Sequence, residues 1–84
     1  MGDMDIQIAL AKVIREERQK QNLSQLALSE KAALHLNTVQ ALESGKYVAK
    51  VSTLFQLSKA FDVSAASIID RIEDLEPDIP TDAY

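Results

Sequence analysis

Residues that break helices are almost absent from most of this chain, and this absence constrains the fold more than any other feature. The 84 residues contain two glycines and two prolines, and both prolines lie near the C-terminus, at positions 77 and 80. Between residues 6 and 72, apolar residues recur three or four positions apart, without the alternation that marks half-buried strands. A chain of this length forms one domain. The sequence therefore predicts an all-α fold, a compact bundle of about five short helices.

Short polar joints divide this stretch into its helices. The predicted helices span about residues 6–21, 25–32, 36–44, 51–61 and 65–72. Ser24 and Ser64 are suited to cap the second and fifth helices, because their hydroxyls accept hydrogen bonds from unpaired backbone N–H groups. Asn22 and Gly45 are suited to end the first and third, because both residue types tolerate a left-handed backbone.

Apolar side chains at helical spacing predict which faces enter the core. For the first helix this face consists of Ile6, Leu10, Val13 and Ile14, and for the fourth of Val51, Leu54, Leu57 and Phe61. The fifth helix carries Ile68, Ile69 and Ile72.

Charge is distributed unevenly along the chain. The net charge is −4, yet residues 10–71 hold all nine lysines and arginines against six acids, a net of +3. The other seven acids lie at the two ends. We therefore divide the chain into a mildly basic domain, residues 1–72, and an acidic, proline-containing tail, residues 73–84, which we expect to be flexible.

Composition excludes several function classes. Without cysteine the chain has no disulfide, thiolate metal site or cysteine nucleophile, and its single histidine, His35, has no partner cluster. Two glycines cannot build a known phosphate-binding loop. No apolar run approaches the ~20 residues of a membrane helix, and the acidic N-terminus is unlike a signal peptide. We expect a cytoplasmic protein that is not an enzyme, with no cofactor, no metal and no membrane contact.

The most informative stretch is residues 23–45, LSQLALSEKAALHLNTVQALESG. It resembles the helix-turn-helix of the phage repressor/Cro-like family, also called the XRE family. Leu23, Ser24 and Gln25 match the opening of the first motif helix, and Leu28 its buried leucine. The close of the recognition helix is matched by Thr38, Val39, Leu42, Glu43 and Gly45. The resemblance covers about residues 8–70 and implies a lambda-repressor-like fold that binds double-stranded DNA.

The helix around residues 35–44 would then enter the major groove, which admits one α-helix. Val39 and Leu42 form its inner face, above Leu28. The outer face, which we predict to contact base edges, consists of Leu36, Asn37, Gln40 and Ala41. Asparagine and glutamine can each bond an adenine edge through two hydrogen bonds.

Phosphate contacts are expected around this helix. Gln25 begins the preceding helix, where backbone N–H groups attract anions. The following loop offers Lys46, Tyr47 and Lys50, although the lysines could simply be solvated and the tyrosine could pack over the loop. We assign Glu43 a structural role, paired with a cation of the first helix, for which Arg18 is the candidate.

Several positions depart from the family pattern. Ala33 stands where the turn usually has glycine, and Lys50 where a capping serine or threonine is usual. Leu36 and Ala41 occupy positions that are often basic, and Leu26 replaces a usual acid. These departures leave the fold intact but lower the expected phosphate affinity, so that dimerisation becomes part of the functional hypothesis.

The resulting hypothesis is a sequence-specific transcriptional regulator that binds a pseudo-palindromic operator as a homodimer, with half-sites about 10 base pairs apart. Restriction–modification controller proteins and small phage repressors resemble this plan. The predicted dimer surface is Ile68, Ile69 and Ile72, exposed in a monomer.

Two alternatives stay open. The chain could be an antitoxin-like or other interaction module whose acidic tail binds a partner protein, which would account for Leu26, Leu36 and the tail residues Asp78, Ile79 and Tyr84. The tail could also compete with DNA for the basic face.

Overall fold

A computed structural model describes residues 4–78 of the chain, and these residues form five α-helices and no β-strand. The helices are α1 (Ile6–Lys20), α2 (Gln25–Ala32), α3 (Leu36–Glu43), α4 (Val51–Phe61) and α5 (Ala65–Asp74). The predicted fold class is confirmed. The predicted bounds of α2 and α4 are also confirmed, whereas α1 and α3 end one residue earlier and α5 ends two residues later than predicted.

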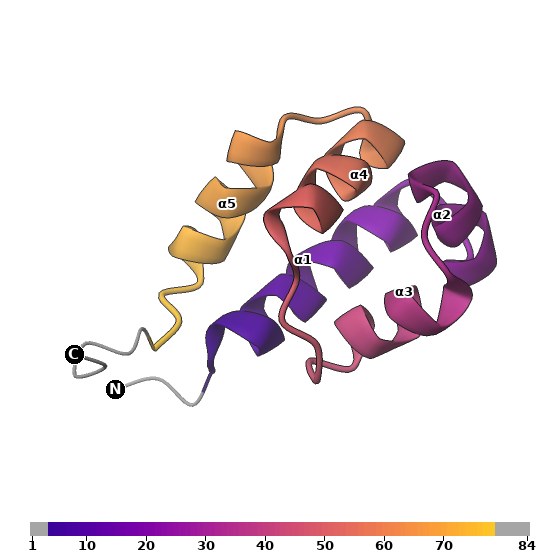
Figure 1. The fold of residues 1–84 in the computed structure, drawn as a ribbon. Helices are drawn as coiled ribbons and strands as arrows, with labels where there is room; N and C mark the ends of the chain where they lie inside the picture. The colour runs from indigo at the N-terminus through magenta and orange to yellow at the C-terminus, as the bar shows by residue number, and fades with distance from the viewer. Residues whose placement is uncertain (1–3, 79–84) are drawn as a thin grey trace.

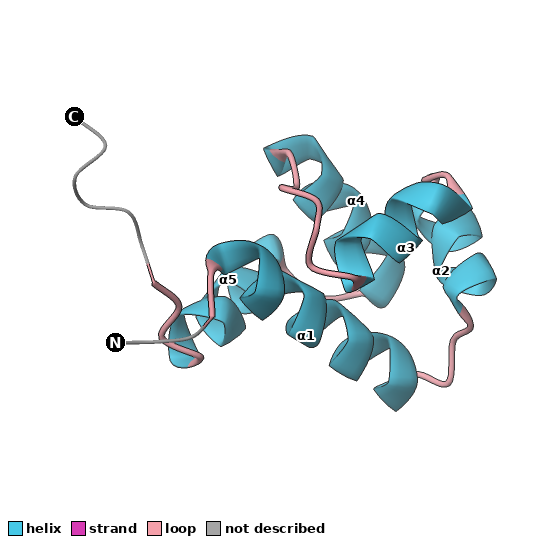
Figure 2. Ribbon diagram, turned by 90° about the horizontal axis from the view of Figure 1, so that it is seen from below, coloured by secondary structure: helices cyan, strands magenta, loops and turns pink. Residues whose placement is uncertain are grey.

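Helix α1 lies in the middle of the molecule (Figure 1). Helices α2 and α3 lie towards one side of it, and α5 lies on the other side. It packs against both α3 and α5, while α4 packs against α2 and α5 and so closes the bundle. Figure 2, seen from below, shows that only short loops and turns join the helices. α3 is therefore held by α1 and α2 on its inner side.

Side-chain caps begin three of the helices. The hydroxyls of Ser24 and Ser64 accept hydrogen bonds from backbone N–H groups three residues later, each at 3.0 Å, as predicted. The carboxylate of Asp5 does the same for α1. Lys50 and His35 precede α4 and α3 without a side-chain cap.

Residues with a left-handed backbone conformation follow the ends of several helices. Asn22 and Gly45 adopt it as predicted, with φ angles of +57° and +76°. A Cβ atom added to Gly45 would lie 3.3 Å from Cγ1 of Ile8, so the site also needs the absence of a side chain. Ala33, in the turn between α2 and α3, adopts φ +56°. The helix-turn-helix pattern that the sequence resembles usually has glycine at this position, and here the site carries the strain of a left-handed alanine.

The core is made by apolar residues from all five helices. Its largest fully buried side chains are Ile14, Leu28, Val39, Leu42 and Leu57. The prediction that Val51 is buried is wrong, since it is 68% exposed, and Ile6 is exposed as well. Each is the first residue of its helix, next to the segment that precedes it.

The chain beyond α5 returns to the N-terminus. Leu75 packs against the core, and the backbone N–H of Asp78 donates to the carbonyl of Met4 at 2.8 Å. The boundary expected after residue 72 therefore falls inside α5. Ile79 and Tyr84, which we assigned to the tail, lie outside the described residues.

Candidate DNA-binding site

α2, the turn at residues 33–35 and α3 form a helix-turn-helix unit. The inner side of α3 is fixed by Val39 and Leu42, which are fully buried, together with Leu28 of α2. The predicted inner face of α3 is thus confirmed.

The outward face of α3 is polar and uncharged. Asn37, Gln40 and Ser44 are exposed, and Leu36 and Ala41 lie half-buried on either side of them. Residues three and four apart share one helix face, so these five side chains form one surface. The four residues predicted to contact bases therefore lie together.

A buried ion pair positions α3 against α1. The Arg18 guanidinium donates from Nε to Oε2 of Glu43 at 2.6 Å and from Nη2 to Oε1 at 3.0 Å, which confirms the predicted pairing. The side chains are only 15% and 4% exposed, and hydrogen bonding to the carboxylate raises the pKa of Arg18. Arg18 also donates to the carbonyl of Leu23, and Arg15 donates to the carbonyl of Glu43. This bidentate ion pair fixes both the position and the orientation of α3 relative to α1.

Gln25 joins the same network. Its side-chain amide donates to Oε1 of Glu43 at 3.1 Å, so that the N-terminus of α2 is tied to the C-terminal end of α3. An amide nitrogen carries two hydrogens, and the second is free to bond a phosphate oxygen. The structure therefore gives Gln25 a positioning role that the sequence did not suggest, beside its predicted phosphate contact.

The loop between α3 and α4 carries the other predicted phosphate contacts. Lys46 and Lys50 are exposed, whereas Tyr47 is half-buried against the core. The burial of Tyr47 matches the alternative in which its ring packs over the loop. Its hydroxyl remains a candidate phosphate ligand.

The predicted dimer surface needs correction. Ile68 and Ile72 are only 2% and 8% exposed, so the expectation that they are exposed in a monomer is wrong. Both pack into the core, and only Ile69, at 40%, is exposed. Two apolar residues of α4 are also exposed: Phe55 (61%), which no sequence pattern singled out, and Val51 (68%), which was assigned to the core. Phe55 does not belong to the set of residues predicted to form the core face of α4. Its position in the sequence could therefore have indicated that its side chain is exposed.

A second polar cluster, also missed, anchors α5 to α1. Nη1 of Arg71 lies 2.6 Å from Oε1 of Glu17, whose other oxygen accepts from Gln21 at 2.7 Å. Gln21 also donates to the carbonyl of Phe61. The hydrogen bond from Gln21, and then that from Arg71, lower the pKa of Glu17 against the opposing effect of burial.

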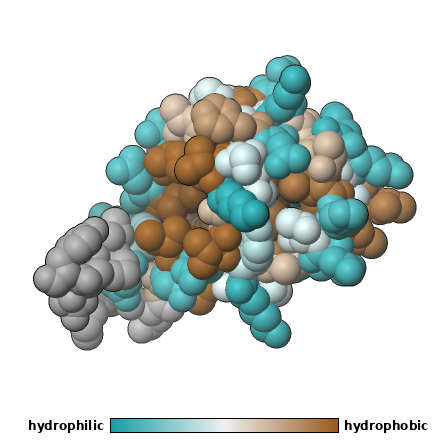
Figure 3. Space-filling view, viewed as in Figure 1, coloured by the Kyte–Doolittle hydropathy of each residue, from teal (hydrophilic) through white to brown (hydrophobic). Residues whose placement is uncertain are grey.

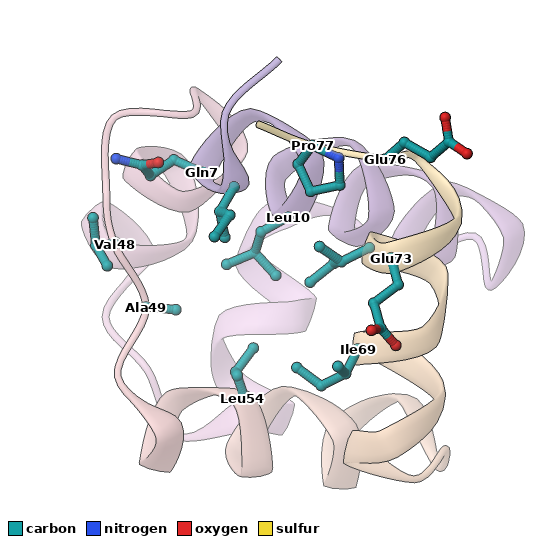
Figure 4. A pocket seen from close by; sticks show the side chains of 11 residues that line it. Gln7, Leu10, Val48, Ala49, Leu54, Ile69, Glu73, Glu76 and Pro77 are labelled. Atoms are coloured by element: carbon teal, nitrogen blue, oxygen red, sulfur yellow. The ribbon is translucent and has the colours of Figure 1, made fainter. Parts of the chain in front are cut away.

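Apolar side chains gather around a pocket of about 370 Å³, where α1, α4, α5 and the α3–α4 loop meet (Figures 3 and 4). Its apolar lining includes Ile6, Leu10, Val48, Leu54, Ile69 and Ile72. Glu73 and Glu76 add carboxylates to the lining, and no residue of α3 contributes. The pocket is thus separate from the helix-turn-helix surface.

Within residues 4–78, no group of three or more histidines, cysteines and acids is placed to hold a metal ion. None of the described helices is long and apolar enough to cross a membrane.

Comparison with known proteins agrees with this geometry. A helix-turn-helix family profile matches residues 14–68. The control protein C.SmaI of Serratia marcescens is 35% identical over 68 residues, which cover 81% of each chain.

Two solved structures share the fold. The clp gene regulator ClgR of Corynebacterium glutamicum superimposes with a TM-score of 0.81 at 18% identity, covering 88% of this chain and 79% of that one. The wild-type restriction–modification controller protein C.Esp1396I gives 0.77 at 16% identity, covering 89% and 96%. The chain belongs to the helix-turn-helix family of the XRE type, a family of DNA-binding regulators and not of enzymes.

Proposed function

We propose that this protein is a sequence-specific transcriptional regulator that binds a pseudo-palindromic operator as a homodimer. The observation that carries the proposal is the outward face of α3, polar, exposed and held rigidly by the Arg18–Glu43 pair. The names of the similar proteins, a control protein, a gene regulator and a restriction–modification controller, support a regulatory role of the same kind. Such a protein acts in the cytoplasm, with the DNA that it regulates.

The proposed contacts divide into two classes. Leu36, Asn37, Gln40 and Ala41 would face base edges, and Gln25, Lys46, Tyr47 and Lys50 would meet phosphates. Because the outward face of α3 carries no cation, affinity depends on the loop lysines, the N-terminus of α2 and a second subunit. Two-fold pairing would place the two α3 helices about 34 Å apart, one turn of DNA.

The proposed dimer surface combines Ile69 of α5 with Val51 and Phe55 of α4, whose exposed apolar area a partner would cover. Ile68 and Ile72 support this surface from the core side. Ile69→Asp should give a monomer in sedimentation equilibrium. Leu26→Asp on α2, which alters a leucine that is 54% exposed against 40% for Ile69, is the matched control and should stay dimeric. An Ile69→Asp variant that dimerises like the wild type would refute this surface.

Selection of bound duplexes from a random pool tests the main proposal. We expect one enriched, two-fold symmetric sequence, with an affinity that falls steeply as salt rises because phosphate contacts release counterions. Gln40→Ala should reduce the preference for that sequence, whereas Lys46→Ala should weaken binding to all sequences alike. If no duplex binds at low salt, the proposal fails.

A second role, in binding a partner protein, is favoured by the apolar pocket with its carboxylates Glu73 and Glu76. The acidic tail would then bind the partner or, alternatively, compete with DNA for the basic face. A chain ending at Asp78 keeps the contact to Met4 and removes only residues 79–84. If this shorter chain binds DNA and the full chain does not, residues 79–84 act as a brake on DNA binding.

A further inference from the structure

The outward face of α3 combines hydrogen-bonding amides with apolar groups and carries no charge. Asn37 and Gln40 are exposed one helical turn apart, and Leu36 and Ala41 lie beside them. Glu43, the one charged residue of this helix, is buried and paired with Arg18 of α1. The helix therefore offers bases two amides and two apolar contacts, and nothing cationic.

The arginines nearest to α3 are engaged elsewhere. Arg18 is bound by Glu43 and by the carbonyl of Leu23, and Arg15 donates to the carbonyl of Glu43. These contacts hold both guanidinium groups at the C-terminal end of α3, on its α1 side. Neither can serve as a base-reading group at Leu36, Asn37 or Gln40 without breaking the network that positions α3.

Base pairs differ in the chemistry that reads them. Guanine is read chiefly by arginine or lysine, through two acceptors in the major groove. Adenine presents one donor and one acceptor, which match an asparagine or glutamine amide, and thymine presents a methyl group to apolar side chains. The outward face of α3 is thus complementary to A·T pairs and lacks the group that best recognises guanine.

We infer, on the basis of the proposed function, that α3 reads consecutive A·T base pairs, with Leu36 against a thymine methyl group. Asn37 and Gln40 are separated by about 4.5 Å along the helix axis. This distance is close to the 3.4 Å step between base pairs. The two amides therefore reach the adenines of neighbouring pairs. Leu36 begins α3, and the N-terminal residues of a recognition helix are those that contact base edges.

Base analogues in the selected operator test the inference. Replacing thymine by deoxyuridine removes only the methyl group, so the full chain should bind about fourfold more weakly where Leu36 makes its contact, the effect of one buried carbon. The Leu36→Ala variant should bind both duplexes equally, because it has no contact to lose. Alanine keeps the helical propensity of this position, and circular dichroism checks that the variant is folded. Leu26→Ala, on the neighbouring helix, is the matched control and should keep the fourfold difference.

A gain of function provides a second test. Gln40→Arg places a guanidinium on the outward face. The variant should therefore prefer a G·C base pair in place of an A·T base pair at one position of each operator half-site. The tests with Leu36→Ala and Gln40→Arg each measure a change in base preference and not merely a loss of binding.

The outcomes separate the inference from the proposed function. Enrichment of A·T pairs beneath α3, together with the methyl effect, supports both. Specific binding to guanines beneath α3, with no effect of deoxyuridine, overturns the inference and leaves the regulator intact. Absence of any DNA binding at low salt overturns both.

Discussion

Removal of the Arg18 side chain should destabilise the domain severely. The Arg18→Ala variant leaves the Glu43 carboxylate, only 4% exposed, with Gln25 as its remaining side-chain donor. Breaking a buried ion pair on one side costs about 3–5 kcal/mol, because the remaining charge is desolvated and unpaired. For 84 residues the whole free energy of unfolding is about 4–13 kcal/mol, so this loss takes a large part of it.

Urea unfolding followed by far-ultraviolet circular dichroism measures this loss. The matched control is Arg15→Ala on the same helix, which removes one hydrogen bond from an exposed residue and should cost about 0.5–1.5 kcal/mol. The double variant Arg18→Met/Glu43→Leu removes both charges and should recover most of the stability. An Arg18→Ala variant within 1 kcal/mol of the wild type would refute the view that this pair holds α3 in place.

Two further perturbations have defined outcomes. Folding lowers the pKa of Glu17 below 4.5, chiefly through Gln21, so its contribution to stability is present above the unfolded pKa and lost as the pH falls through the folded pKa. Glu17→Gln should therefore flatten the acid limb of a thermal-midpoint profile below about pH 4.5, and an unchanged limb would contradict this assignment. Ala33→Gly should raise the unfolding free energy by about 0.5–1 kcal/mol in urea titration, because glycine relieves the left-handed strain but adds freedom to the unfolded chain. A loss of stability would show that Ala33 is not strained.

The sequence predicted the helix bounds well because capping and helix-ending residues act within a few positions of the chain. The hydroxyl caps at Ser24 and Ser64, and the stop signals at Asn22 and Gly45, depend on chemistry within four residues, and they placed most helix bounds within one residue. The Arg18–Glu43 pair was found because the motif positions both residues relative to its helices.

Contacts between distant segments could not be predicted in this way. Arg71 and Glu17 are 54 residues apart, and no periodicity pairs them. Helical spacing placed Ile68 and Ile69 together as apolar residues of α5, but it could not say which one another helix covers. Val51 matched the spacing of the core face and is nevertheless exposed, because it begins its helix beside a loop.

The most direct test of DNA recognition by α3 is a specificity ratio. The affinity of the full chain for its selected operator, divided by that for a scrambled duplex, is measured at one fixed salt concentration for the wild type and for Asn37→Ala/Gln40→Ala. Both positions are exposed, so the variant should fold normally. Recognition through α3 predicts a ratio of at least 10³ for the wild type. In the variant the ratio should fall by more than tenfold, while binding to the scrambled duplex stays the same. An unchanged ratio would contradict recognition through α3.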